Sequence, residues 1–503
     1  MELKEKKQSK NFLFVYPLRL SECSSIEILS AVLKKAGHNT SLILHHAQEK
    51  YFENRLKKRI EEFKPDFIGF SVMTTDYAWA LKTAKLIRKF TKAPIVFGGI
   101  QVTSCPEEVI SQDCVDFIVV GEGEGAILDL IENPKKTNIK NVWFKKDKKI
   151  IKNPLRPLIQ DLDSIPFLDK DLFLREAPHF KELYVCMTGR GCPFSCTYCF
   201  NCFMRNMYPG EKWVRKRSVK NVIEELKIAK EKINPKTILF IDDCFTSHKE
   251  WLLEFLRIYR QEINIPFKVL THPNFVNDEM LEALKKSKCV SIELGVQTPS
   301  ERVRKDICKR NESNELVKEV VQKIKNHKMF VLTDHIFQLP STTFEEYEKG
   351  LEFYIDIKPS KITQFWLQYY PNTEIVEIGK KYGEYTDKEL KETIKGNIVW
   401  DSYNQRKVKA NPKLAQIARF ICWIPVLPRG VSRYILKKKL YPKIFFTDSL
   451  NIPPYIIKYL SSFSTIPVTL RALKRTIVMK RHLAQLNKEG EMSSENANNK
   501  LLE

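Results

Sequence analysis

The sequence predicts an α/β protein with an N-terminal doubly wound parallel sheet, then a partial (β/α)6 TIM-like barrel, then a mostly helical C-terminal domain. Short runs rich in Val, Ile and Phe alternate with amphipathic stretches from residue 11 to about 375, which is typical of parallel sheets. The length of 503 residues suits about three domains. No run approaches the roughly 18–20 apolar residues that a membrane-spanning helix needs.

The first domain is predicted over residues 11–132, after a flexible N-terminus of residues 1–10. Helical patterns separate its apolar runs, so the runs are expected to form parallel strands whose ligand site lies beyond their C-terminal ends. Small residues follow several of these strands and let a backbone approach a ligand closely, although the same glycines can equally serve to turn the chain. The expected strands are 12–16, 40–45, 67–72, 94–99 and 116–121, and the expected helices are 26–37, 51–63, 78–90 and 106–112.

A hairpin and an extended linker are predicted over residues 133–178, and the barrel over residues 179–378. The helical C-terminal domain follows at 379–486, and a polar tail at 487–503 is expected to be disordered. In the barrel we expect strands at 184–189, 238–243, 267–273, 291–297, 331–340 and 362–371, and helices at 219–232, 248–262, 278–287, 313–327 and 343–357.

Cysteines are concentrated at the start of the barrel. The chain has twelve, and six of them fall between Cys186 and Cys244. Cys192, Cys196 and Cys199 share one short loop, and thiolates are the ligands that iron–sulfur clusters take. Three ligands would leave one iron of a four-iron cluster open, as a catalytic centre requires. Zinc is the alternative, but no Cys-x2-Cys pair follows downstream of Cys202.

The string Cys-x3-Cys-x-Tyr-Cys, with Tyr198 as its aromatic residue, resembles the signature of radical S-adenosylmethionine (SAM) enzymes. Further stretches resemble the strand-end motifs of that family, and parts of the first domain resemble the cobalamin-binding domain that precedes many such barrels. The barrel stretches are Ile241–Phe245, Ser291–Thr298, Phe337–Pro340 and Gln368–Thr373, and the stretches in the first domain are Val96–Gly99 and Val120–Glu124.

The resemblance implies three cofactors, a 4Fe–4S cluster, SAM and cobalamin. The cluster would reductively cleave SAM to a 5′-deoxyadenosyl radical, and the implied reaction is methylation of an unactivated carbon. A radical cyclase or rearrangement enzyme acting on a lipid-like or tetrapyrrole-like substrate is one alternative, and an iron–sulfur binding or electron-transfer protein is another. No catalytic residue is assigned beyond the cluster. The implied metal ligands are Cys192, Cys196 and Cys199, the implied SAM-binding residues are Tyr198, Asp242, Glu293 and Gln297, and the implied cobalamin-binding residues are Ser71, Thr74, Gly98, Gly99, Gly121 and Glu122.

One departure concerns the lower face of cobalamin. Domains that ligate cobalt from below carry an Asp-x-His-x-x-Gly string after the first strand, whereas the corresponding stretch here, Tyr16–Ser25, has no histidine. Bound cobalamin would therefore lack a protein imidazole beneath its cobalt. The same absence also fits a domain that has lost the cofactor, and both interpretations stay open.

Positive charge is concentrated near the C-terminus. The net charge is +23, and residues 405–482 contribute seventeen Lys and Arg against the single acid Asp448. Cations that alternate with aromatic residues suit peripheral association with an anionic membrane, suit RNA less well, and equally suit a solvated helical face. The expected partners are a small-molecule or lipid-like substrate and a low-potential electron donor, and the expected location is the cytoplasm.

Overall fold

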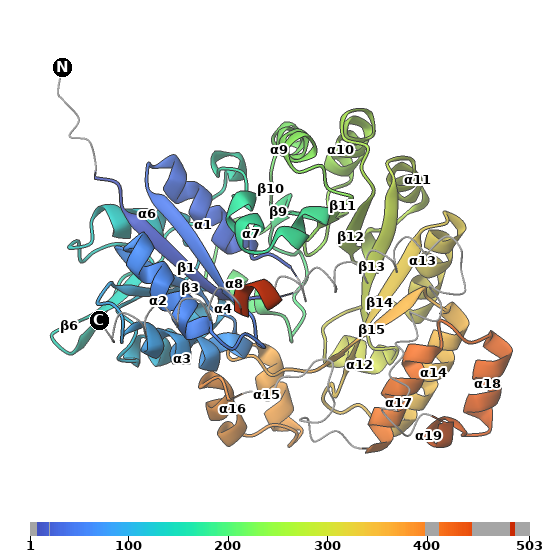
Figure 1. The fold of residues 1–503 in the computed structure, drawn as a ribbon. Coiled ribbons are helices and arrows are strands. Elements are labelled where there is room, and N and C mark those ends of the chain that lie inside the picture. The colour runs from blue at the N-terminus through green and yellow to red at the C-terminus, as the bar shows by residue number, and fades with distance from the viewer. Residues whose placement is uncertain (1–7, 20, 398–411, 445–482, 488–503) are drawn as a thin grey trace. The chain divides into compact units, whose positions relative to one another are not determined.

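The computed structural model describes residues 8–19, 21–397, 412–444 and 483–487 (Figure 1). The chain divides into two compact units, each with its own hydrophobic core. The N-terminal unit comprises Met1–Lys181, Lys391–Ile398 and Arg475–Glu503, and the barrel unit comprises Glu182–Leu390 and Val399–Lys474.

Seven strands form one sheet in the N-terminal unit, in the order β2-β1-β3-β4-β5-β6-β7. The first five are parallel, as predicted, whereas β6 and β7 form an antiparallel hairpin at the edge. The order changes direction between β1 and β3, the position at which doubly wound sheets bind ligands. The strands are β1 (Asn11–Pro17), β2 (Asn39–His45), β3 (Phe67–Ser71), β4 (Ile95–Gly98), β5 (Phe117–Val119), β6 (Val142–Lys146) and β7 (Lys149–Lys152).

Both faces of this sheet are covered. On β1, Phe12 and Phe14 pack in one core with Ile26 of α1 and Ile127 of α6. Successive side chains of a strand point to opposite faces, and the residues that alternate with Phe12 and Phe14 are equally buried. The helices are α1 (Ser24–Lys35), α2 (Phe52–Phe63), α3 (Tyr77–Ile87), α4 (Ile100–Ser104), α5 (Pro106–Ser111), α6 (Glu124–Glu132) and α7 (Lys170–Glu176), with 3-10 turns η1 (Thr74–Asp76), η2 (Leu162–Ser164) and η3 (Pro178–Glu182).

The segment after the hairpin, expected to be extended, contains the short helix α7. Lys170 begins this helix, and its ammonium lies 2.9 Å from a carboxylate oxygen of Glu22 and 2.9 Å from one of Glu27. All three side chains are buried. These ion pairs attach the segment to α1 and to Glu22 just before it. A sequence pattern does not reveal such an interaction, because it joins residues far apart in the chain.

The barrel unit has a six-stranded parallel sheet in the order β15-β14-β13-β12-β11-β8, so each strand lies beside its successor in this series. This open series confirms the predicted partial barrel. The strands are β8 (Leu183–Cys186), β11 (Thr237–Phe240), β12 (Phe267–Thr271), β13 (Cys289–Gln297), β14 (Phe330–Phe337) and β15 (Lys361–Trp366), and a small antiparallel pair joins β9 (Gly189–Arg190) to β10 (Arg215–Lys216).

Side-chain caps fix where several barrel helices begin. Ser218, Asn277 and Ser313 each accept a hydrogen bond from a backbone N–H in the first turn, and Thr343 forms a capping box with Glu346. The helices are α8 (Phe200–Asn206), α9 (Val219–Lys232), α10 (Lys249–Glu262), α11 (Asp278–Lys286), α12 (Glu301–Asp306), α13 (Asn314–Asn326), α14 (Phe344–Ile357), α15 (Glu374–Lys381) and α16 (Asp387–Ile394), with the 3-10 turn η4 (Pro273–Phe275).

Strand β13 shows how the barrel interior is built. Ile292, Leu294 and Val296 are buried in the core with the surrounding helices. Because successive side chains alternate, Glu293 and Gln297 lie on the opposite face, which is the interior of the barrel. Polar side chains are thus directed to the interior near the C-terminal strand ends, where barrel enzymes place their active sites.

Three helices are described between residues 412 and 444: α17 (Pro412–Trp423), α18 (Arg429–Lys437) and α19 (Tyr441–Ile444). Ile417 and Phe420 of α17 share the barrel core with Trp366 of β15, and Gln364 donates to the Ala418 carbonyl at 2.6 Å. The C-terminus is therefore helical where it is described. Residues 1–7 of the N-terminus, much of the basic segment (405–411 and 445–482) and residues 488–503 of the tail lie outside the described residues. Among the helices that are described, none has the length and apolar character needed to cross a bilayer.

Candidate active site

The loop that carries Cys192, Cys196 and Cys199 lies between β9 and α8 and is fixed at both ends. Gly191 has φ +85°, and a Cβ there would lie 2.4 Å from the Trp213 carbonyl oxygen. Thr197 donates to the Ile307 carbonyl at 2.6 Å, and its own carbonyl accepts from the Ile375 amide at 3.0 Å. The loop is thus held by segments that follow β13 and β15.

The three cysteines of this loop are free thiols. Cys196 is buried and the other two are half-buried, and the Cys199 amide donates to the Cys196 carbonyl at 3.0 Å. Burial raises the pKa of Cys192 to about 12 and that of Cys199 to about 11. A metal centre here would therefore bind with release of thiol protons.

Within the described ranges, no three His, Cys, Asp or Glu side chains converge on a point where they could hold one metal ion. A four-iron cluster takes its cysteine thiolates at different irons, so its ligands need not meet at one point. Three free thiols on one anchored loop are a donor set that fits such a cluster.

Cys196 has two donors beside it that come from different parts of the unit. Arg310 Nη1 lies 3.8 Å from its sulfur, and the Tyr198 hydroxyl also forms a hydrogen bond to it. Burial raises the pKa of Tyr198, so this phenol stays protonated and able to donate. Arg310 is buried, donates to Glu312 at 2.7 Å through Nε, and bonds to the Gly295 carbonyl.

The sequence reading missed Arg310 and Glu312. They lie in the polar run Lys309-Arg310-Asn311-Glu312, which resembles a solvated turn. A buried arginine and a surface arginine give the same sequence signal, so the burial was visible only in the fold.

Asp242 and Asp243, at the end of β11, have different surroundings. Asp242 accepts from the Thr188 amide at 3.0 Å and hydroxyl at 2.6 Å, and pairs with Lys216 at 2.9 Å. Asp243 is exposed to solvent. Desolvation by the surrounding protein groups nevertheless raises its pKa, and this effect outweighs a hydrogen bond with Asn201 that lowers the pKa. The charge of Asp243 also contributes to the raised pKa of Cys192 and of Cys199.

Glu293 and Gln297 lie on the interior face of β13. Burial and the adjacent Glu293, through its charge and a hydrogen bond, raise the pKa of Asp334 on β14 to about 8. Gln297 has φ +67°, and its amide nitrogen would lie 2.6 Å from a Cβ at Gly295. Gly295 therefore leaves room for the Gln297 side chain, and its carbonyl connects this position to Arg310.

The candidate SAM residues therefore divide into two groups. Tyr198 and Gln297 lie around Arg310 and the Cys196 side of the loop, and Glu293 follows along the same strand face. Asp242 is engaged with Thr188 and Lys216 instead.

Five of the six candidate cobalamin residues gather at the C-terminal edge of the N-terminal sheet. Ser71 contacts Ser25 at 3.1 Å between their hydroxyls, and the Gly98 carbonyl accepts from the Val72 amide at 2.8 Å. The Gly121 amide donates to the Thr103 hydroxyl at 3.1 Å. These contacts join the ends of β3, β4 and β5 and the start of α1.

Two features of this edge fit a ligand. Thr74 Oγ1 and Ser24 Oγ are buried, and neither has a hydrogen-bond partner among the described residues. A Cβ at Gly98 would meet nothing nearer than 3.8 Å, whereas one at Gly99, with φ +98°, would lie 2.7 Å from the Val72 amide. The backbone conformation and the close approach of Val72 thus require a glycine at position 99. At position 98 the missing side chain instead leaves space that a ligand could occupy.

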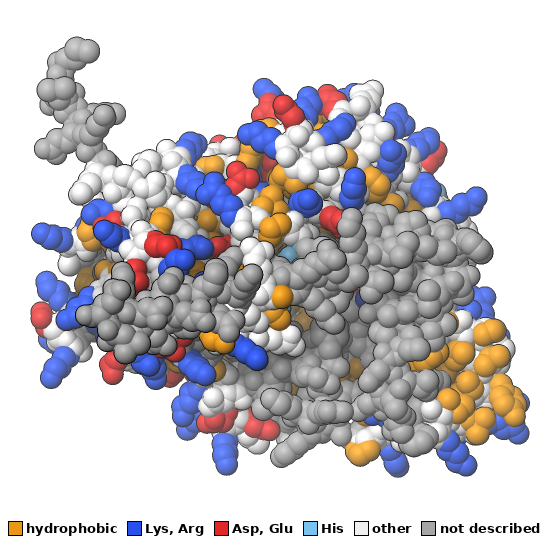
Figure 2. All heavy atoms as spheres, in the orientation of Figure 1, with side chains coloured by type: hydrophobic (Ala, Val, Ile, Leu, Met, Phe, Trp, Pro, Cys, Tyr) orange, Lys and Arg blue, Asp and Glu red, His pale blue; other side chains and the backbone are white. Residues whose placement is uncertain are grey.

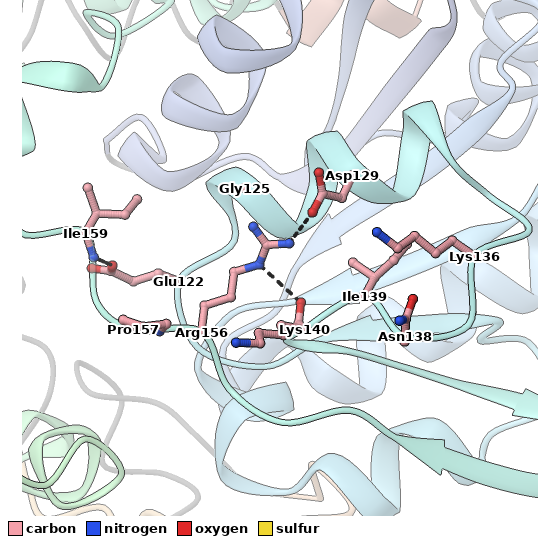
Figure 3. A pocket seen from close by; sticks show the side chains of 10 residues that line it. All are labelled: Glu122, Gly125, Asp129, Lys136, Asn138, Ile139, Lys140, Arg156, Pro157 and Ile159. Carbon is pink, nitrogen blue, oxygen red and sulfur yellow. Dashed lines mark hydrogen bonds and ion pairs between the residues drawn. The ribbon is translucent and has the colours of Figure 1, made fainter.

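Glu122 follows Gly121 directly but has different surroundings from the other five. It accepts from the Ile159 amide at 2.9 Å and lines a pocket of about 530 Å³ beside α6 (Figure 3). Arg156 crosses this pocket, pairs with Asp129 and donates to the Lys140 carbonyl at 3.3 Å. None of the other five candidate cobalamin residues lines it.

Comparisons with known proteins identify two families along the chain. The model of the radical SAM superfamily matches residues 187–354, and that of the B12 binding domain matches residues 24–131. An uncharacterized methyltransferase of Pyrococcus horikoshii is 30% identical over 64% of this chain and 71% of its own length. The anaerobic magnesium-protoporphyrin IX monomethyl ester cyclase of Rubrivivax gelatinosus is 22% identical over 69% of this chain and 64% of its own length.

Two solved structures share the fold. The radical SAM methyltransferase TsrM of Kitasatospora setae, with cobalamin and a [4Fe-4S] cluster bound, superposes with a TM-score of 0.63 at 16% identity, over 74% of this chain and 75% of that one. The cobalamin-dependent SAM radical enzyme OxsB, with aqua-cobalamin and SAM bound, superposes with a TM-score of 0.66 at 15% identity, over 96% and 81%.

Proposed function

The chain belongs to the radical SAM superfamily and carries a B12 binding domain ahead of its barrel, and on that premise we propose that it transfers a methyl group to an unactivated carbon of a small-molecule substrate. Membership confirms the predicted enzyme class and the predicted cofactors, a 4Fe–4S cluster, SAM and cobalamin. Methyl transfer is supported by the 30% identical relative, which is named as a methyltransferase.

We propose Cys192, Cys196 and Cys199 as the cluster ligands. Bound there, the cluster and SAM would supply the radical chemistry, and cobalamin the methyl carrier. The chain's own residues bind, orient and shield these groups. The observation that carries the proposal is the set of three free thiols on a loop held in place by Thr197.

For SAM we propose Tyr198, Glu293 and Gln297, which lie along one side of the barrel interior toward Cys196. Asp242 was expected with them, and its ionic contact with Lys216 favours a role in holding the β8–β10 edge. The neighbouring Asp243, accessible beside Cys192 and Cys199, is the carboxylate better placed to receive a hydrogen bond from a bound cofactor.

For cobalamin we propose Ser71, Thr74, Gly98, Gly99 and Gly121, with Glu122 as a support for the β5–α6 turn. The unpartnered hydroxyl of Thr74 and the free space at Gly98 support a ligand at this edge. The missing histidine in Tyr16–Ser25 would leave the lower face of cobalt without an imidazole. Such a face suits a cofactor that alternately gains and loses a methyl group.

The test uses the full chain, reconstituted without oxygen, with cobalamin and SAM whose methyl group carries deuterium. The proposal expects the labelled methyl on the protein-bound cobalamin, detected by mass spectrometry after reduction. Absence of label from a fully loaded, reduced enzyme would refute methyl transfer.

A radical cyclase is the second candidate, favoured by the 22% identity to the Rubrivivax gelatinosus cyclase. A cyclase would cleave SAM to 5′-deoxyadenosine without labelling cobalamin, so the same experiment separates the two. An electron-transfer protein would do neither. Either enzyme also needs a low-potential electron donor.

We also propose peripheral docking on an anionic membrane from the cytoplasmic side. Much of the basic segment lies outside the described residues, but α18 exposes Val431 (44%) and Tyr434 (59%) beside Lys437 and Lys438. Figure 2 shows hydrophobic side chains gathered where Figure 1 draws α18, with Lys and Arg side chains at the edge of the patch. Exposed apolar side chains flanked by cations suit a lipid headgroup layer.

Vesicle sedimentation tests the docking. Binding to vesicles containing phosphatidylglycerol, none to pure phosphatidylcholine, and weaker binding of Tyr434→Glu would support it. Equal binding of wild type and variant, or binding to RNA alone, would contradict it.

A further inference from the structure

A ring of contacts connects the cysteine loop to two other segments of the barrel unit and returns to it. The Phe194 ring, in the loop, stacks on His272 after β12 with 3.8 Å between centroids. His272 Nε2 lies 3.4 Å from Glu312, and Glu312 accepts from Arg310 at 2.7 Å. Arg310 then reaches back to the sulfur of Cys196, two residues beyond Phe194.

The orientation of His272 in this ring is fixed by the backbone. The Asn274 amide donates to His272 Nδ1 at 3.2 Å, so Nδ1 is the acceptor nitrogen and the proton is assigned to Nε2, which faces Glu312. Burial lowers the pKa of His272, so the ring is neutral near neutral pH. The carboxylate of Glu312 therefore has one full counter-charge among these contacts, the guanidinium of Arg310.

The charge on Glu312 is stable over a wide pH range. Burial alone would raise its pKa, but the contact with His272 and the charge of Arg310 outweigh burial and lower the pKa to about 2. Glu312 is also buried. It therefore holds the guanidinium through Nε, while Nη1 faces Cys196 and Nη2 faces the Gly295 carbonyl.

We propose that Arg310 is a positioning residue for the cluster: it donates a hydrogen bond to the Cys196 sulfur when that sulfur binds iron, and so raises the cluster's reduction potential. The inference rests on the proposed function, because it takes Cys196 as a ligand. Hydrogen bonds to cluster sulfurs and nearby charge set the potentials of iron–sulfur centres. A buried cation beside one ligand stabilises the reduced cluster, which carries one more negative charge.

An EPR-monitored redox titration of the anaerobically reconstituted full chain tests the inference, with wild type, Arg310→Gln and Arg310→Lys. A hydrogen bond to a charged group is stronger than one between neutral groups. We therefore expect the ratio of reduced to oxidised cluster in R310Q to be about tenfold below that of wild type at the same applied potential. This corresponds to a reduction potential about 59 mV lower for a one-electron couple. R310K keeps the positive charge but loses the planar guanidinium with its several donors. Its reduction potential should therefore lie between those of wild type and R310Q.

Lys309→Gln is the matched control, because it removes one positive charge from the adjacent position. Lys309 is exposed and pairs with Glu374 at 2.6 Å, so its loss should leave the potential unchanged. An equal shift in K309Q and R310Q would overturn the inference in favour of a general effect of net charge.

A second measurement needs no variant. Wild-type enzyme is produced in cells supplied with arginine whose guanidinium carries ¹⁵N. Pulsed EPR of the reduced cluster should then show a coupling to ¹⁵N, from the guanidinium of Arg310. A loaded cluster without that coupling overturns the inference, even where R310Q fails to fold or to take up iron. A wild-type chain that binds no cluster at all would instead refute the proposed function, so the two failures are distinguishable.

Discussion

Arg310 and Cys196 are 114 positions apart in the sequence, and Nη1 of the arginine lies 3.8 Å from the sulfur of the cysteine. The contact shows that the cysteine loop is not a self-contained motif. Its surroundings come from the segment after α12, the end of β12 and the start of α15. These segments of the partial barrel are therefore part of the proposed cluster site.

The ligand assignment predicts a sharp difference between neighbouring cysteines. Cys196→Ala should lose the iron–sulfur absorption and SAM cleavage, because two thiolates cannot hold the cluster in place of three. Cys202→Ala is the matched control, since Cys202 lies one helical turn beyond Cys199 and outside the proposed set. Iron content and product formation check both, and loss of iron in Cys202→Ala with retention in Cys196→Ala would reverse the assignment.

Substitutions at two adjacent glycines should have different effects, one on stability and the other on cobalamin binding. Gly99→Ala should lower the free energy of unfolding by about 2 kcal/mol or more, because φ is +98° and the new Cβ would lie 2.7 Å from the Val72 amide. Gly98→Ala should change stability by no more than about 0.5 kcal/mol. It should weaken cobalamin binding about tenfold by filling the space at the strand end. Thermal unfolding and equilibrium dialysis measure the two effects, and full binding by Gly98→Ala would place the ligand elsewhere.

Asp334 predicts a pH dependence of stability. Burial and Glu293 raise its pKa to about 8 in the folded state, against an ordinary value of 3.8. The folded chain therefore holds this proton more tightly, so the contribution to stability is complete below about pH 4 and is lost as the pH rises to about 8.

Asp334→Asn should remove this slope. The variant should gain stability relative to wild type between pH 6 and pH 8, by at most about 1.4 kcal/mol per pH unit. Thermal midpoints of both proteins at the two pH values provide the check, with the exposed Asp356→Asn as control. Parallel pH profiles for wild type and Asp334→Asn would show that Asp334 is ionised in the folded chain.

Lys170 predicts a stability effect far from the proposed chemistry. Lys170→Met would leave the carboxylates of Glu22 and Glu27 buried without their cation, at a cost of about 3–5 kcal/mol in unfolding free energy. Lys181→Met, at an exposed lysine of the same unit, should be close to neutral. Urea unfolding of the three proteins measures this, and equal midpoints would mean that the ion pairs contribute nothing.

Much of the fold follows from local pattern. Helix 219–232 was predicted with the bounds that α9 has, and the structure shows that Ser218 caps its start. The hairpin at β6 and β7 was expected from its turn residues. Helix α7 was not predicted, because seven residues give little periodicity and its stability comes from buried ion pairs with α1.

The site was partly predictable for the same reason. Three cysteines close in sequence are visible at once, whereas Arg310, Glu312 and Asp334 become recognisable only when the fold buries them beside other groups. The stacking of His272 on Phe194 likewise joins segments that are far apart in the sequence. Long-range contacts of this kind leave no trace in the spacing of a single sequence.

The most direct test of the central claim is to reconstitute the wild-type chain without oxygen, count iron and sulfide, and follow SAM under reducing conditions. The account predicts about four irons and four sulfides per chain, and SAM consumption that stops when Cys192, Cys196 and Cys199 are all changed to alanine. A chain that binds iron at trace level, or a full cluster that leaves SAM intact, would contradict it.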